Sequence, residues 1–132
     1  MTRPDPQRHY LAAAGGLMIT APQLARLTLL AWDGGCGFIS RECLDLMKRP
    51  IAHWPQKQAP MSHGMGLLTL QDQRLSPQPI WGHQGFAYGA VNGVFFNEQG
   101  SGFALLDSGA SEQRRGHLAL LNQDLIRLWM KG

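Results

Sequence analysis

Cysteine is scarce in this chain of 132 residues, which has only Cys36 and Cys43. Neither thiol belongs to a Cys-x-x-Cys motif, and no cysteine or histidine has partners at the spacing of a zinc site. Nothing in the pattern of either thiol indicates a disulfide or an activated nucleophile. The sequence therefore predicts free thiols, no metal and no cofactor.

Long apolar runs and clustered positive charge are also missing. No window reaches the roughly 20 apolar residues of a membrane helix, and residues 1–10 have no apolar signal-peptide core. The 12 basic and 9 acidic residues give a net charge of +3, and most of the basic residues are scattered. Nucleic-acid binding needs a concentrated basic face. We therefore expect a soluble chain without an export signal that binds neither membrane nor nucleic acid.

Glycine and proline are abundant, with 16 and 8 residues, and 44% of the chain is hydrophobic. This composition favours one folded domain over residues 1–132, built from short elements separated by many turns. We expect an irregular lead-in over residues 1–14, a helical part over residues 15–50, and a sheet with a C-terminal helix over residues 66–132.

Two helices are predicted in the helical part. Thr20 and Gln23 form the Thr-x-x-Gln pattern of a capping box, and two glycines end this helix just after Trp32. Ser40 is placed to cap a second, shorter helix, which Pro50 ends.

The strands are predicted from apolar runs rich in valine and phenylalanine. Residues 51–66 have no periodicity and are expected to form a long surface connection. A short strand is expected at residues 67–70, another begins at Trp81, and residues 88–96 and 103–107 form an antiparallel pair.

The last helix is predicted over residues 113–130 from an apolar stripe of leucines that ends at Trp129. Two helices, then strands, then a helix is the order of an α+β fold. We expect a small antiparallel sheet that the C-terminal helix covers on one face, preceded by two short helices.

His83 is the most prominent titratable residue of the strand region. It follows Gly82 and lies two positions before Gly85, where a missing side chain lets a ligand approach the backbone. Two interpretations remain open: a wall of a substrate site, or a structural or solvated histidine. Asn92 is similarly either a polar group aimed at a cleft or a hydrogen-bonded amide within its strand.

A recognisable nucleophile motif is missing. No serine has a lysine three positions later, so the Ser-x-x-Lys pair that places both side chains on one helix face is absent. The serines tested in this way are Ser40, Ser62, Ser76, Ser101, Ser108 and Ser111.

Four short segments, taken in order, resemble one family. They are Ala-Gly-Gly-Leu-Met-Ile-Thr at residues 14–20, Gly-His-Gln-Gly-Phe at 82–86, Val-Phe-Phe-Asn at 94–97 and Gly-x-Gly-Phe-Ala-Leu-Leu at 100–106. Their order and spacing resemble the C-terminal part of the serine β-lactamase-like family, which includes class C β-lactamases, DD-carboxypeptidases and related esterases.

The resemblance implies roles for one triplet and the residue after it. On the sheet-edge strand, the family has Lys or His, then Thr or Ser, then Gly, and His83, Gln84 and Gly85 match at two positions. The resemblance implies that His83 faces the substrate carboxylate or the nucleophile, and that Gly85 leaves room for substrate. The backbone N–H of Phe86 would be one of two oxyanion donors. Gln84 replaces the hydroxyl residue.

Family members carry Ser-x-x-Lys and Tyr-x-Asn motifs upstream, and this sequence contains neither. The resemblance therefore implies a partial β-lactamase/transpeptidase-like fold that is incomplete relative to the family, whose members are often periplasmic or secreted. We expect the C-terminal portion of a serine hydrolase that is inactive alone.

Two alternatives remain. The chain could be a non-catalytic binding or assembly module that pairs through an exposed sheet edge, either as a homo-oligomer or with the missing N-terminal half. It could also be an independent hydrolase with a nucleophile outside the known motifs.

Overall fold

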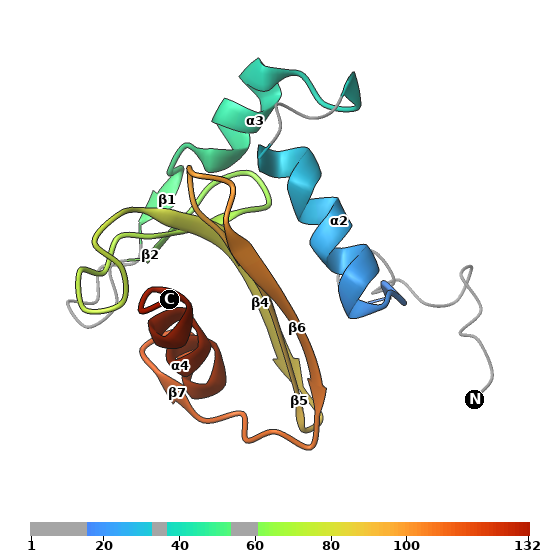
Figure 1. The fold of residues 1–132 in the computed structure, drawn as a ribbon, viewed down its shortest axis with the longest axis vertical. Coiled ribbons are helices and arrows are strands. Elements are labelled where there is room, and N and C mark those ends of the chain that lie inside the picture. Colours follow the sequence, from blue (N-terminus) through green and yellow to red (C-terminus); the bar gives the residue numbers. More distant parts are fainter. Residues whose placement is uncertain (1–15, 33–36, 54–60) are drawn as a thin grey trace.

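A six-stranded antiparallel sheet is the centre of the fold (Figure 1). The computed structural model describes residues 16–32, 37–53 and 61–132, so the expected lead-in and Cys36 lie outside the described residues. The strands follow one another in the sheet in chain order: β1 Ala52–His53, β2 Met61–His63, β3 Leu68–Leu70, β4 Ile80–Ala87, β5 Ala90–Phe96 and β6 Gly102–Ser108. The expected α+β class is confirmed.

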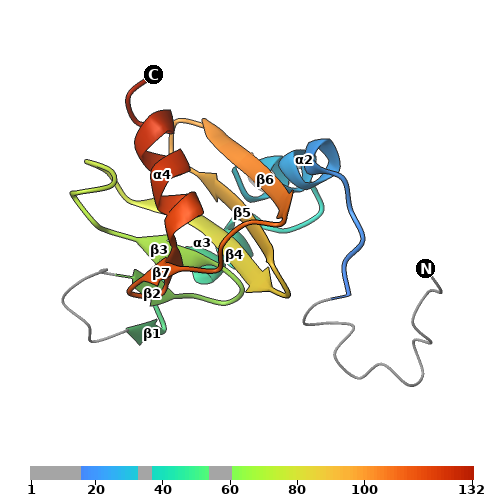
Figure 2. The same cartoon turned by 90° about the horizontal axis from the view of Figure 1, so that it is seen from below.

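The helices lie on both faces of the sheet. Helix α4, Leu120–Trp129, packs on one face, and helix α2, Ala21–Trp32, lies along β5 and β6 on the other, as Figure 2 also shows. Helix α3, Arg41–Lys48, follows α2. The expected packing of the C-terminal helix on one face of the sheet is confirmed, and α2 adds apolar side chains on the second face.

The predicted starts of the first two helices, α2 and α3, are confirmed. The backbone N–H of Thr20 donates to Gln23 Oε1 at 3.0 Å, and the N–H of Gln23 donates to Thr20 Oγ1 at 3.4 Å, which is the reciprocal pair of a capping box. Ser40 Oγ accepts from the N–H of Cys43 at 3.2 Å. These caps satisfy N–H groups that the first helical turn leaves without partners.

The segment expected to be a surface connection instead contains two strands. β1 pairs with β2, and β2 pairs with β3 in the register Met61↔Leu70. Both strands are too short, at two and three residues, to show an alternating pattern. Burial of Met61 in the core, which the sequence pattern does not reveal, makes β2 a strand of the sheet.

The start of the last helix was also predicted wrongly. A small hairpin of β7, Arg114–Arg115, and β8, Leu118–Ala119, comes first, and the helix begins only at Leu120. Gly116 turns the hairpin with a φ of 63°. Leu118 belongs to the apolar stripe of the sequence, but it reaches the core from β8 and not from a helix.

The core lies between α4 and the sheet. Its members are apolar side chains from β2, β3, β4, β5, β8, α4 and the loop after β3: Met61, Leu68, Leu70, Leu75, Ile80, Phe95, Leu118 and Ile126. Phe103 continues this core towards the C-terminus, with ring centroids 5.6 Å from Phe95 and 5.8 Å from Trp129. The core holds α4 against one face of the sheet and so fixes the position of β4 relative to α4.

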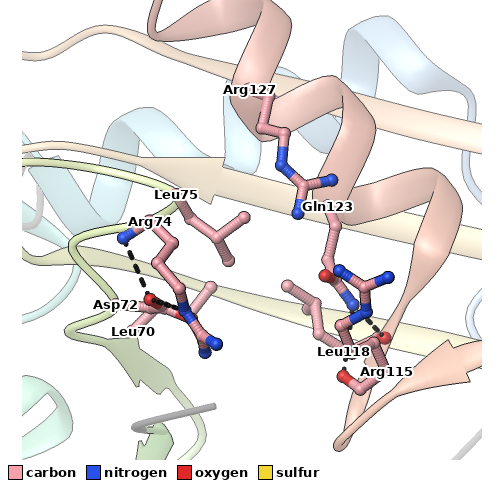
Figure 3. Close-up of a pocket in the computed structure, with 8 residues that line it drawn as sticks. All are labelled: Leu70, Asp72, Arg74, Leu75, Arg115, Leu118, Gln123 and Arg127. Carbon is pink, nitrogen blue, oxygen red and sulfur yellow. Dashed lines mark hydrogen bonds and ion pairs between the residues drawn. The ribbon is translucent and has the colours of Figure 1, made fainter. Parts of the chain in front are cut away.

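An ion pair joins Asp72 and Arg74 in the loop after β3 (Figure 3). The Arg74 guanidinium donates to both carboxylate oxygens of buried Asp72, at 2.8 and 2.7 Å, and these bonds lower the pKa of Asp72. A lowered folded-state pKa adds stability above the unfolded pKa, which is lost as pH falls through the folded value. We expect Asp72→Asn to lower the urea midpoint at pH 7 and to lose most of this deficit at pH 2.

Asp124→Asn is the matched control for this prediction. Asp124 pairs with Arg127 at 2.8 Å, but its side chain is 68% exposed, and exposed pairs add little stability. Equal deficits of the Asp72 variant at both pH values would contradict a role for its charge.

The β4–β5 hairpin is closed by a strained two-residue turn. Tyr88 and Gly89 have φ values of 57° and 74°, which is the type I′ pattern, so the strand expected at residue 88 begins at Ala90. The Tyr88 side chain is fully exposed, so no packing offsets the unfavourable backbone conformation.

Tyr88→Asn is expected to stabilise the protein by roughly 1 kcal/mol, because asparagine tolerates positive φ better than tyrosine. The measurement is the free energy of unfolding in urea. Tyr88→Phe keeps the strain and should leave stability unchanged, and a gain of equal size in both variants would refute this explanation.

Candidate functional site

His83 lies on the α2 side of β4. Side chains alternate along a strand, so His83 and Gly85 face α2, whereas Gln84 and Phe86 face α4. An open cleft of ≈ 430 Å³ lies between this face and α2. Asn92 lines it from the neighbouring strand β5.

Apart from Gln84 and two glycines of the strands, the other described lining residues of the cleft are aliphatic. Its aliphatic lining comes from the segment before α2, from α2 itself, and from β5 and β6: Leu17, Ile19, Leu24, Leu27, Val94 and Leu106. His83 is exposed there, so it can contact a ligand without any rearrangement of the core. The cleft thus combines a histidine, an amide and a hydrophobic wall, which is a common composition for a small-molecule site.

Among the described residues, no strand pairs with the outer side of β4 along its second half. β3 pairs with β4 only from Leu70↔Ile80 to Leu68↔Gly82. The pair that flanks a two-residue turn is hydrogen-bonded, and such pairs alternate along an antiparallel ladder. From the pair Ala87↔Ala90, the alternation turns the N–H of Phe86 away from β5. The resemblance predicts an oxyanion donor at this N–H, and its direction suits that role.

Gln84 is held on the opposite face. Its Oε1 accepts from the N–H of Ala119 at 3.0 Å and from Asn122 Nδ2 at 3.3 Å, and its Nε2 donates to the carbonyl of His117. The amide therefore ties β4 to β8 and α4. The substrate-wall role expected for Gln84 stays a prediction, and this amide is committed to structural hydrogen bonds.

Asn122 is a site-supporting residue that the sequence analysis missed. It is fully buried on α4, and its Nδ2 also donates to the carbonyl of Asn92 at 3.2 Å. A Cβ atom on Gly93 would lie 2.2 Å from Asn122 Oδ1. The abundance of glycine in the strand region indicated that some group approaches the backbone closely. The sequence did not show that Asn122 is this group.

The Phe86 side chain, which lies on the α4 face of the sheet, makes a cation–π contact with Arg114. The guanidinium carbon of Arg114 lies 4.8 Å from the centroid of the Phe86 ring. This contact joins β7 to the end of β4, close to the backbone N–H that faces outward.

None of the six serines lines the cleft, and all six lie within the described residues. Four of their hydroxyl groups have other partners, including Ser111 Oγ, which accepts from the N–H of Gln113 at 3.3 Å. Ser40 caps α3, Ser76 Oγ donates to the carbonyl of Gln78 at 2.6 Å, and Ser101 Oγ accepts from Trp129 Nε1 at 2.8 Å. The exposed thiol of Cys43 is on α3 and also outside the cleft. The cleft therefore has a polar wall but no hydroxyl or thiol nucleophile from the described part of the chain.

Comparison of the sequence with protein-family models and curated proteins, and of the fold with solved structures, found no match. Over residues 16–32, 37–53 and 61–132, no three side chains of the metal-binding types gather closely enough to hold an ion. The helices described here are too short or too polar to cross a bilayer.

Proposed function

We propose that this chain forms one wall of an acyl-transfer site of the serine β-lactamase or DD-peptidase type, and that the nucleophile comes from a segment outside this sequence. His83 and the N–H of Phe86 would face the reacting carbonyl from one side. Alone, the chain would be inactive, because no described residue of the cleft brings a hydroxyl or thiol that could attack that carbonyl.

The observation that carries this proposal is the position of the cleft at an open strand edge. Acyl transfer needs hydrogen-bond donors aimed at the developing oxyanion. His83 lies in the cleft, and the ladder alternation turns the N–H of Phe86 towards the unpaired side of the same strand. Asn92 adds a second polar group opposite α2. Three groups that could bind a substrate carbonyl, the His83 and Asn92 side chains and the N–H of Phe86, therefore lie in the same region.

A small tetrahedral anion tests the wall directly. Dimethylphosphinate, which mimics the tetrahedral intermediate, should shift the backbone amide signals of Gln84, Gly85 and Phe86 in an NMR titration. We expect His83→Ala to weaken this binding about tenfold, through loss of one charge-assisted hydrogen bond. His63→Ala, on β2 and outside the cleft, should bind like the wild type. Equal affinity in both variants, or shifts confined to another face, would refute the wall.

A second candidate function is assembly through the edge of β6. Within the described residues β6 has a strand neighbour on one side only, and Leu106 on this strand is 37% exposed. An unpaired edge is a template for strand addition. We infer that this edge pairs either with a second copy or with the nucleophile-bearing segment.

Light scattering over a range of concentrations tests assembly. Dimers should form as concentration rises, and Leu106→Lys should weaken them because a charge at the edge opposes strand pairing. Leu128→Lys, at an exposed position on α4, is the matched control and should not. A strictly monomeric wild type at high concentration removes support for self-pairing.

A further inference from the structure

A second pocket continues the His83 cleft away from β4. It measures ≈ 270 Å³ and lies between α2, α3 and the α2-side face of β5. Leu24, Leu27 and Val94 line both spaces, so a ligand that reaches from one into the other stays against the same wall. Leu44 and Met47 line the pocket from α3.

This pocket offers almost no polar contact. Thr28 is the one polar side chain among its described lining residues, and its Oγ1 donates to the carbonyl of Ala25 one turn earlier. Phe38, at 80% exposure, lines the same pocket with an aromatic ring. A charged or strongly hydrated group would lose its water there without finding a new partner.

The cleft itself also lacks a cation for a carboxylate. Neither lysine nor arginine is among the described residues that line the two spaces, and the Gln84 amide is occupied on the α4 face. Within these two spaces, a peptide substrate that ends in a free carboxylate would therefore find no described guanidinium or ammonium group to pair with its charge. His83 is the only titratable side chain in the described lining.

We propose that the second pocket takes the aliphatic acyl chain of the substrate, which makes the substrate an ester or amide of a medium-chain acid. This inference rests on the proposed function, because it assigns the carbonyl of the same substrate to the His83 wall. Each methylene transferred from water to an apolar wall adds up to about fourfold in affinity until the pocket is filled.

Neutral acyl amides test the substrate class without any reaction. The N-methylamides of butanoic, hexanoic and octanoic acid are titrated into the labelled chain and followed by NMR. We expect affinity to rise up to about fourfold per methylene, with shifts at the methyl groups of Leu44 and Val94 and at the backbone amide of Phe86. N-acetyl-D-alanyl-D-alanine, with its free carboxylate, should bind more weakly than the octanoyl amide.

Two substitutions at one position separate pocket chemistry from folding. Thr28→Glu introduces a charge on the pocket wall and should abolish the dependence on chain length. Thr28→Val removes the hydroxyl at nearly constant volume and should keep it. Circular dichroism and thermal unfolding of both variants verify that α2 remains intact, and a chain-length dependence that survives in a folded Thr28→Glu variant overturns the proposal.

The other outcomes are distinct from one another. Shifts at Phe86 with no dependence on chain length overturn the acyl pocket and leave the proposed function standing. Dependence on chain length with no shift at Phe86 supports the apolar pocket and removes the proposed function. A second copy seated on this face would appear as a dimer in light scattering that long-chain amides do not dissociate, and that result overturns the acyl pocket.

Discussion

Gly93→Ala, on β5, is expected to lower the free energy of unfolding by about 3 kcal/mol, because the added methyl group has no room. The new Cβ would lie 2.2 Å from Asn122 Oδ1. Asn122 cannot yield easily, because it is fully buried and its Nδ2 is bonded to Gln84 and to the Asn92 carbonyl. Urea unfolding followed by circular dichroism measures the loss.

Gly85→Ala is the matched control on the neighbouring strand. A Cβ at Gly85 meets nothing within 4 Å, so this variant should be neutral or more stable by up to about 1 kcal/mol. Equal losses in the two variants would mean that strand conformation, and not contact with Asn122, determines the cost.

Gln84→Thr is expected to cost roughly 2 to 3 kcal/mol, although threonine is one of the two residues, with serine, that the family resemblance puts at this position. The shorter side chain cannot reach the N–H of Ala119 or the Asn122 amide, both of which Gln84 Oε1 now accepts from. The N–H of Ala119 would be buried without a partner, and Asn122 Nδ2 would keep only its bond to the Asn92 carbonyl. β4 would lose its tie to α4.

His83→Thr is the control that tests whether any substitution in the triplet His83–Gln84–Gly85 lowers stability, or only one that removes the Gln84 amide. His83 is exposed in the cleft, so its replacement should change the free energy of unfolding by less than about 0.5 kcal/mol. Urea unfolding of both variants decides the matter. A Gln84→Thr variant as stable as the wild type would show that other groups or water satisfy Ala119 and Asn122.

Local signals predicted the helix caps well, whereas long-range burial determined the elements that were missed. The capping roles of Thr20 and Ser40 are predictable from local sequence, because each hydroxyl accepts from an N–H only three residues later. β2 exists because Met61 is buried beside Leu70, and no local pattern records that pairing. The β7–β8 hairpin was hidden inside a leucine repeat that also suits a helix.

The candidate site was predictable in part. The sequence singled out His83 beside Gly85, and the structure places both residues on the cleft. Asn92 lines the same cleft, which was one of the two interpretations left open for it. Asn122 was missed because a polar residue on a helix is ordinarily solvated, and only the packing of α4 on β5 buries it. The apolar pocket was unpredictable because α2, α3 and β5 are distant in sequence.

The central claim, that this chain provides a wall but no nucleophile, is tested most directly by intact-mass spectrometry. The purified chain is incubated with a fluorophosphonate and, separately, with a chromogenic cephalosporin, beside a complete serine β-lactamase that verifies both reagents. Because no serine lines the cleft, we predict an unchanged mass for this chain in both reactions. A stoichiometric adduct on any of its six serines would contradict the account.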